Sequence, residues 1–419
     1  MAHRVPFPPN KGDKIRSFYE LKHLTHGHEV HLLAFYEDPR DGGHASTLRQ
    51  YCHDVKLIPL QPWLQTGRAL VKLVAGRPWS LGYFSHGAMW KAVQEKLQSN
   101  SFDVVFVYSS SMAPYIEQVQ IPRILDFVDS DASKWGQYAE RRKLPLSWLF
   151  GLEARRLGRY EKQMADVFDY SLFVSEREAA HLVSSLTSGR IKIVRNGVDL
   201  DFFTPRAPRS EAPLIVFTGA MDYFPNVDAV GFFSAEVLPL IRKYVSDARF
   251  QIVGSDPSRA VRRLAQMPGV SVVGRVPDTR PYLADARVAV APLRISQGIQ
   301  NKILEALAMG VPVVASEKAA GGLADLENLP LSIAGKVEDY VDQTVGWLKR
   351  PRLTWSEILA CRTRLKENYD WQTNLGELDR LWPQIGHDKL REDADNCRSD
   401  SGLHGTARMC RESDGNVVD

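Results

Sequence analysis

The stretch AVAPLRISQGIQNKILEALAMGVPVVAS, residues 289–316, contains one complete strand–loop–helix–strand unit. An apolar run ends at Pro292, a loop with Gly298 follows, and the apolar spacing over Ile299–Met309 predicts a helix. Gly310 ends that helix, and the apolar residues after it begin the next strand. Units of this kind build parallel sheets that helices cover, so the stretch predicts an α/β domain.

Similar units recur on both sides of this stretch, as short β-branched runs separated by amphipathic segments of helical length. Strands are expected at His28–Tyr36, Asp54–Leu60, Phe102–Tyr108, Arg123–Val128, Tyr170–Val174, Ile191–Arg195, Pro213–Thr218, Arg249–Gly254, Gly269–Gly274, Arg287–Pro292, Val311–Ala315 and Leu331–Ala334. Two sets of near-continuous apolar strands alternating with helices predict two doubly wound, Rossmann-like α/β domains.

The expected organisation has four parts. They are an N-terminal domain over 1–205, a second domain over 206–360, a returning C-terminal helix over 361–386, and a tail over 387–419 that is too polar to fold. A Pro/Gly loop begins at Pro6, so that at most Ala2–Val5 supplies the first, central strand. A missing central strand costs several kcal/mol. We therefore expect that Met1 is an internal start or that this form has low stability.

Composition excludes several classes of protein. Hydrophobic residues make up 44% of the 419 residues and charged residues 25%, which is ordinary globular usage and excludes a disordered or fibrous chain. The 53 basic and 50 acidic side chains nearly balance, which argues against a nucleic-acid partner. The four cysteines have no disulfide-framework spacing, and no signal peptide or long apolar span is evident. We expect a cytoplasmic protein.

The start of the predicted helix after Gly298 has the features of an anion site. Free N–H groups and the positive end of the helix dipole favour a phosphate there, and Lys302 adds a full charge. Glu305, one turn later, can bind sugar hydroxyls beside that phosphate. A buried crossover helix with solvated Lys and Glu explains the same spacing.

Gly219, directly after a strand, permits close approach of a ligand, though a lone glycine is weak evidence.

Several motifs together resemble the retaining glycosyltransferases of family 4, which have the GT-B fold. The turn Arg195–Asp199 is similar to the family's Asn-Gly-Val-Asp turn, and Gly274–Asp278 to its Gly-x-Val-x-Asp segment. Glu305 falls on the second glutamate of the family's Glu-x7-Glu motif, which binds the donor ribose. The resemblance extends from residue 2 to about Trp382, and it implies two facing Rossmann-like domains and a nucleotide-sugar donor.

The resemblance also implies which residues bind the donor. They are Gly219, Arg275, Arg294, Gln297, Gly298, Ile299, Lys302 and Glu305. Two departures stand out. Gln297 occupies the place of the motif's first glutamate, and the family's diphosphate-binding Arg and Lys are missing at Ala220 and around Pro225–Asn226. We expect Lys302, Arg294 or Arg275 and the helix N-terminus to meet the diphosphate charge instead. Neither a cofactor nor a metal is expected.

The acceptor is expected on the N-terminal side, near Gly12, Arg16 and Lys134. In such enzymes the leaving diphosphate is thought to accept the acceptor's proton, and the protein positions both substrates. Asp129 or Asp131 could orient or deprotonate the acceptor hydroxyl, and we therefore group them with Glu305 as candidate catalytic residues. Both carboxylates could equally cap the following helix.

A narrower similarity concerns sugar transferases associated with PEP-CTERM/exosortase exopolysaccharide loci. It rests on Pro8–Ser17, Gly76–Pro78, Asp126–Trp135 and Gly298–Lys302, and it implies a growing, lipid-linked glycan as acceptor. Residues 141–162 hold seven basic and two acidic side chains around an apolar run, so they could contact an anionic membrane surface, unless that run is a buried helix start.

Two alternatives to a glycosyltransferase stay open, a sugar-nucleotide epimerase of the same fold and a non-catalytic assembly partner.

Four histidines near the N-terminus, His23, His26, His28 and His31, have the composition of a metal cluster. The segment Gly27–Val30 reads as a helix-to-strand turn, and strand alternation scatters the side chains that follow it. We therefore expect these histidines to be ordinary core or surface residues.

Overall fold

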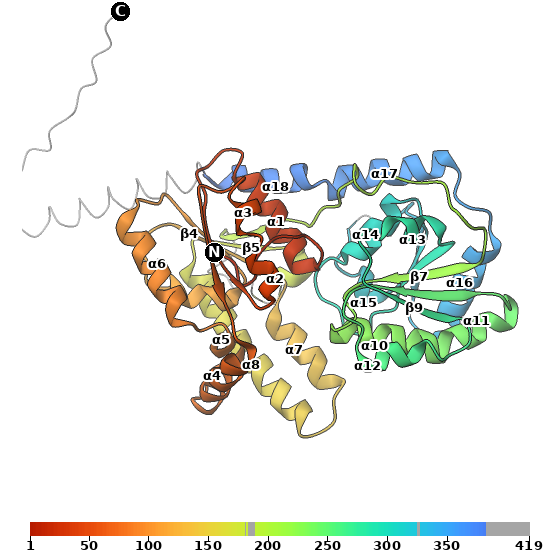
Figure 1. Cartoon of the computed structure of the whole chain (residues 1–419), viewed down its shortest axis with the longest axis horizontal. Coiled ribbons are helices and arrows are strands. Elements are labelled where there is room, and N and C mark those ends of the chain that lie inside the picture. Colours follow the sequence, from red (N-terminus) through yellow and green to blue (C-terminus); the bar gives the residue numbers. More distant parts are fainter. Residues whose placement is uncertain (181, 183–188, 325–326, 383–419) are drawn as a thin grey trace, which may run out of the picture. The chain divides into compact units, whose positions relative to one another are not determined.

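The structure is a computed structural model of the 419-residue chain, and it describes residues 1–180, 182, 189–324 and 327–382. The chain divides into two compact units, Met1–Glu377 and Leu378–Asp419. Most of the second unit, including the tail predicted over 387–419, lies outside the described residues. The fold below is that of the first unit (Figure 1). The boundaries expected at 205, 360 and 386 stay predictions.

The N-terminal sheet is parallel. Its strands are β1 (His31–Tyr36), β2 (Asp54–Pro59), β3 (Val105–Tyr108), β4 (Arg123–Val128), β5 (Tyr170–Phe173) and β6 (Ile191–Ile193). Strand β1 pairs with β2, and β3 to β6 pair in sequence order. Ala2 joins the two groups through parallel bridges to Ala34 of β1 and Tyr108 of β3. The position of the first central strand therefore holds a single bridging residue, in agreement with the short strand expected there.

The second sheet is parallel, with the order β12-β11-β10-β7-β8-β9. Its strands are β7 (Leu214–Thr218), β8 (Arg249–Val253), β9 (Val270–Gly274), β10 (Val288–Ala291), β11 (Val313–Ser316) and β12 (Leu331–Ala334). All twelve predicted strands are present, and their ends differ from the predicted ends by at most three residues. The apolar, β-branched runs predicted these strands correctly, because a central strand that is buried on both faces needs apolar residues along its whole length.

Helices connect the strands. In the N-terminal half they are α1 (Gly12–Leu24), α2 (Pro39–Gly42), α3 (Ala45–Leu48), α4 (Pro62–Val74), α5 (Trp79–Tyr83), α6 (Gly87–Ser99), the 3₁₀ turn η1 (Ser110–Tyr115), α7 (Asp131–Glu140), α8 (Leu146–Val167) and α9 (Glu176–Ala179). In the C-terminal half they are α10 (Phe224–Phe232), the π segment η2 (Phe233–Val237), α11 (Leu238–Tyr244), α12 (Arg259–Leu264), α13 (Arg280–Asp285), α14 (Asn301–Ala308), α15 (Glu317–Ala320), α16 (Val337–Lys349), α17 (Trp355–Tyr369) and α18 (Trp371–Asp379).

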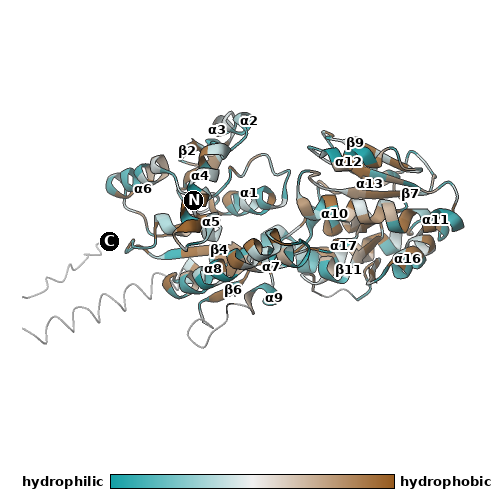
Figure 2. Cartoon of the chain, turned by 90° about the horizontal axis from the view of Figure 1, so that it is seen from below, coloured by the Kyte–Doolittle hydropathy of each residue, from teal (hydrophilic) through white to brown (hydrophobic). Residues whose placement is uncertain are grey.

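Helices cover both faces of the second sheet, with α13 and α14 above it and α10 and α12 below it in Figure 1. The core of this half combines strand residues such as Val216 and Phe250 with helix residues such as Phe233 and Leu304. Figure 2 shows strands such as β4 and β7 as largely hydrophobic, whereas α12 is largely hydrophilic. The fold is therefore stabilised by the burial of apolar strands under amphipathic helices.

The turn between the two halves is hydrogen-bonded to the end of α17. Val198 donates a backbone hydrogen bond to the carbonyl of Tyr369 (2.8 Å), at the end of α17. A Cβ on Gly197 would lie 2.6 Å from the backbone nitrogen of Trp371, so only glycine fits there. The Trp371 ring stacks on Tyr19 of α1 with 4.7 Å between centroids. The C-terminal helices thus contact the N-terminal half.

One helical stretch in the described residues, Phe224–Tyr244, is long and apolar enough to cross a membrane by length and composition alone. Half of its most apolar window is buried inside the structure, and Phe233, Val237, Leu238 and Ile241 belong to the core of the second sheet. A core helix passes the same test of length and composition, so this is weak evidence for a membrane span.

Candidate functional site

The loop before α14 places the candidate anion site. Gly298 has φ +62°, a left-handed conformation that favours glycine. A Cβ at this position would lie 3.2 Å from Oδ2 of Asp129 and 3.3 Å from Cγ2 of Val174. The backbone conformation therefore favours glycine, and a larger residue would also press against the N-terminal half. Ile299 is buried in the core of the second sheet, and α14 begins two residues later at Asn301.

Lys302 lies on the first turn of α14. Its Nζ donates to Oδ1 of Asn226 on α10 (2.7 Å) and stands 4.0 Å from the ring centroid of Phe217 on β7. Burial lowers the pKa of Lys302 to about 7, against the opposing effect of Glu305. A partly buried ammonium of this kind binds an anion strongly, because the anion restores the favourable interactions that burial removes.

Glu305 lies one turn further along α14 and is half-buried. Burial raises the pKa of its carboxyl to about 7, against the opposing effect of Lys302. Among the described residues its carboxylate has no hydrogen-bond partner. An unpaired carboxylate with a raised pKa beside a desolvated ammonium is a candidate binding group for hydroxyls.

Gly219, at the end of β7, brings its loop against Lys302. The residue has φ +153°, and a Cβ there would lie 2.8 Å from Nδ2 of Asn226 and 3.1 Å from Nζ of Lys302. Asn226 also donates to the carbonyl of Ala220 (2.9 Å). Asn226 therefore fixes both the glycine loop and the ammonium. In the sequence, Asn226 stands only at the place of the missing basic pair.

Gln297 is engaged with the N-terminal half. With its amide oriented so that both ends are paired, it donates to Oε2 of Glu178 (3.1 Å) and accepts from Nε2 of Gln137 (2.6 Å). Glu178 also accepts from the backbone N–H groups of Gly298 (3.1 Å) and Ser130 (3.2 Å). Gln137 binds the backbone of the adjacent Ser296 with both ends of its amide. The side chains of Gln137 and Glu178 hold the loop before α14, and nothing in the sequence marked either residue.

The two arginines predicted at the donor site have acidic partners in this structure. Arg294 pairs through Nε with Asp228 on α10 (2.9 Å), and its guanidinium lies 5.0 Å from the ring centroid of Phe232. Arg275 pairs with Asp256 (2.8 Å), and both side chains are about half-exposed. Either arginine must exchange its carboxylate for a diphosphate to serve as predicted, whereas Lys302 needs no such exchange.

The predicted acceptor-side carboxylates lie together with Lys134. Its Nζ is 2.9 Å from Asp131 and 3.3 Å from Asp129. Burial raises the pKa of Asp129 to about 6, although Lys134 opposes the shift. Burial also acts to raise the pKa of Asp131, but Lys134 outweighs it and the pKa lies below its ordinary value. The cap of α7 is Ser130, which accepts from the N–H of Ser133. Asp129 therefore has the properties of a proton acceptor near neutral pH.

Gly12 and Arg16 occupy different environments. Gly12 is exposed at the start of α1, and the neighbouring Lys11 pairs with Asp222 in the loop after β7 (3.4 Å). Arg16 is fully buried and binds Asp126 of β4 (2.6 Å). An acceptor could reach Gly12 directly, whereas Arg16 offers it no exposed surface.

His3 is a further candidate that the sequence did not indicate. Its ring stacks on Tyr108 and is 3.8 Å from Asp13. Burial, followed by the charge of Arg4, lowers the pKa of His3 to about 4, so the ring is neutral. The charges of Asp131 and Lys134 also act on its pKa. A chain position so near the start carried no pattern that could have revealed it.

Part of the chain matches a known protein family and several curated relatives. Residues 212–349, which include the loop and α14, match the family model described as Glycosyl transferases group 1. A D-inositol 3-phosphate glycosyltransferase of Mycobacteroides abscessus is 33% identical over 202 residues, covering 43% of this chain and 45% of the relative. One from Mycolicibacterium paratuberculosis is 31% identical over 211 residues, covering 46% of this chain and 47% of the relative. The matches thus span about half the length of these curated relatives.

Solved structures agree over nearly the whole chain. Sucrose-phosphate synthase from Thermosynechococcus elongatus superposes with a TM-score of 0.66 at 17% identity, covering 93% of this chain and 98% of that structure. Anabaena HepE, solved with UDP and glucose, gives 0.61 at 14% identity, covering 91% and 98%. These likenesses establish the fold, and the family match concerns residues 212–349. The chain thus has the α/β fold of GT-B glycosyltransferase structures, and its residues 212–349 match the glycosyl transferases group 1 domain.

Proposed function

We propose that the chain is a retaining glycosyltransferase that moves a sugar from a nucleotide-sugar donor to a growing glycan. The observation that carries the proposal is the pair Lys302 and Glu305 on consecutive turns of α14, behind Gly298 and against the Gly219 loop. An ammonium and helix N–H groups suit a diphosphate, and the neighbouring carboxylate suits ribose hydroxyls. The family match covers all four residues.

In this proposal the reaction needs little covalent chemistry from the protein. Lys302 and the N-terminus of α14 stabilise the negative charge that develops on the leaving diphosphate. The diphosphate takes the proton of the acceptor hydroxyl on the same face of the sugar, which gives retention. Asp129, with a pKa of about 6, orients that hydroxyl from the N-terminal half. Its nearness to Gly298 supports this assignment.

The acceptor is proposed to be a lipid-linked exopolysaccharide intermediate at an anionic membrane surface. The apolar run near Leu146 is not a buried helix start, because Leu144 and Trp148 are 79% and 60% exposed. On α4, Trp63 and Val74 are 72% and 82% exposed. The basic residues on or beside these segments are Arg68, Lys72, Arg77, Arg141, Arg142, Lys143, Arg155, Arg156, Arg159 and Lys162. Exposed aromatic and aliphatic side chains among cations suit a membrane interface.

The test of the proposal offers purified full-length protein a panel of UDP-, GDP- and dTDP-sugars, with and without bacterial membrane extract. Free nucleotide and glycan product are measured together. Nucleotide release that depends on the extract, together with a new glycan, is the expected result. Interconversion of sugar nucleotides without extract would replace the proposal by an epimerase, and inactivity with every donor would replace it by a non-catalytic assembly partner.

Glu305→Ala should weaken donor binding roughly 10- to 150-fold. The reason is the loss of one charged hydrogen bond to the ribose, worth about 1.5–3 kcal/mol. Binding of the active nucleotide-sugar is measured by calorimetry on protein shown to be folded. Glu338→Ala, the same change on the exposed first turn of α16, is the matched control. Unchanged affinity in Glu305→Ala would remove this carboxylate from the donor site.

Donor affinity should have a bell-shaped pH dependence with its maximum near pH 7. Lys302 and Glu305 both have a pKa of about 7 in the free protein, and binding requires the ammonium and the carboxylate in their charged forms. Affinity falls by up to about tenfold per pH unit on each side, because binding must take up or release one proton. The charge of an intact UDP-sugar is constant over this range. Lys302→Arg should flatten the alkaline side alone, and a profile unchanged by this substitution would contradict the assignment.

A further inference from the structure

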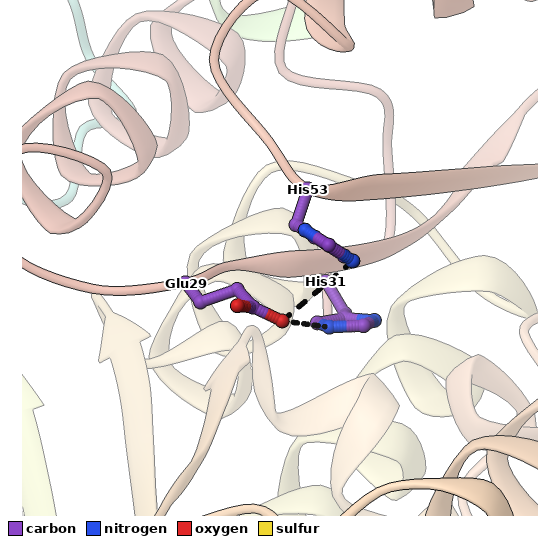
Figure 3. A group of neighbouring side chains, drawn as sticks. All are labelled: Glu29, His31 and His53. Carbon is purple, nitrogen blue, oxygen red and sulfur yellow. Dashed lines mark hydrogen bonds and ion pairs between the residues drawn. The ribbon is translucent and has the colours of Figure 1, made fainter.

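Three side chains with metal-ligating atoms gather where β1 and β2 begin. Glu29 precedes β1, His31 is its first residue, and His53 directly precedes β2 (Figure 3). The parallel register pairs His31 with Asp54, so His53 is brought beside the start of β1. The histidines that lie close together in the sequence are at 23, 26, 28 and 31. His53 comes from the neighbouring strand, so no local sequence pattern reveals this group.

The distances between the ligand atoms suit an ion with tetrahedral coordination. Oε1 of Glu29 lies 3.2 Å from Nε2 of His31 and 3.7 Å from Nε2 of His53. Zinc bonds of about 2.0–2.1 Å in a tetrahedron place neighbouring ligand atoms about 3.3–3.4 Å apart. All three ligand atoms lie within 4.8 Å of one another. A small rotation of the His53 side chain, which is 59% exposed, is therefore enough to close the set around one ion.

The surroundings fix one ligand and leave the others accessible. The His31 side chain is only 8% exposed and packs edge-on against Phe102. Its Nδ1 is 3.5 Å from Nζ of Lys96, and that ammonium is held 2.8 Å from Asp54. The charge of Lys96 is thus already balanced by a carboxylate, and Lys96 moves away from Nδ1 when an ion on Nε2 leaves the ring proton on Nδ1. Glu29 is 67% exposed, so an ion can enter from solvent.

We propose that Glu29, His31 and His53 bind one Zn²⁺ ion, with water at the fourth position. Two imidazole nitrogens and one carboxylate oxygen form a donor set that zinc prefers. The group lies at the amino ends of the strands, whereas Gly219 and the loop before α14 follow the carboxyl ends of theirs. The ion therefore acts as a clip between the chain before β1 and the chain before β2, and it takes no part in sugar transfer.

The proposal is tested on full-length protein without a histidine tag, titrated with ZnCl₂ by calorimetry and by thermal unfolding. Binding of one ion per chain and a rise in Tm that EDTA reverses are expected. Activity with the preferred donor should be the same with and without Zn²⁺. This readout separates the clip from the donor site, and metal binding is expected whether or not the protein proves to be a transferase.

Variants make the assignment specific. His53→Ala and Glu29→Gln change exposed side chains and should each weaken Zn²⁺ binding at least tenfold without lowering the Tm of the metal-free protein. His26→Ala removes an exposed imidazole from the same turn, outside the group, and should bind Zn²⁺ like the unchanged protein. The proposal is overturned if no ion binds, or if His26→Ala weakens binding as much as His53→Ala does.

Discussion

Lys302→Met should lower kcat by about 10²–10³, the usual effect of removing one group that stabilises charge developing in a transition state. The ammonium is already positioned by Asn226 and Phe217 before any donor binds. Burial lowers its pKa to about 7, so an arriving diphosphate gains both its charge and its fixed position. Among the cations predicted for this role, Lys302 is the one without a carboxylate within ion-pair distance in the described structure.

The stability of Lys302→Met should move in the opposite direction from its activity. A lysine with a lowered pKa destabilises the fold below its unfolded pKa of about 10.5, and the destabilisation is complete below its folded pKa. Removal of the charge at pH 7 should therefore leave stability equal or higher, and Lys243→Met on the exposed face of α11 serves as the control. Turnover and urea unfolding are measured on the same preparations. Full turnover in Lys302→Met would show that another cation, not Lys302, binds the diphosphate.

Much of the fold could be predicted because it depends on local pattern. Runs such as PLIVFT and VPVVA are apolar and β-branched, and each became a buried strand. The helix after Gly298 followed from its apolar spacing and from the glycine at each end. The π segment Phe233–Val237 was not foreseen, since no pattern of residue types distinguishes it from an ordinary helix.

The candidate site was predictable only where it lies within one local unit. Gly298, Lys302 and Glu305 belong to a single loop and helix, so their spacing alone predicts that they lie together. The contact of Glu178 with Gly298 joins residues 120 positions apart. The pair between Arg294 and Asp228 likewise depends on how α10 packs, so the sequence alone did not predict it.

Arg16 shows how burial changes an interpretation based on sequence. It was predicted beside the acceptor, yet its guanidinium is fully buried and binds Asp126, Glu20 and the carbonyl of Val194. Its Nη1 also donates to Asn196 (3.0 Å), which in turn donates to Asn301 at the start of α14 (3.2 Å). One chain of hydrogen bonds thus joins Arg16 through Asn196 to the donor helix.

Arg16→Met should lower the free energy of unfolding by about 3–5 kcal/mol, because it leaves Asp126 as an unpaired buried charge. Burial, and then repulsion from Asp126, raise the pKa of Glu20. Glu20 can therefore stay neutral when Arg16 is removed, and the free-energy cost of a buried, unpaired charge falls on Asp126. The loss is measured by urea unfolding at pH 7, with Lys22→Met on the exposed face of α1 as the control. Adding Asp126→Asn to Arg16→Met should recover part of the loss, since the buried charge is then gone. A loss below about 1 kcal/mol, or no recovery in the double variant, would mean that the stability of the N-terminal sheet does not depend on this ion pair.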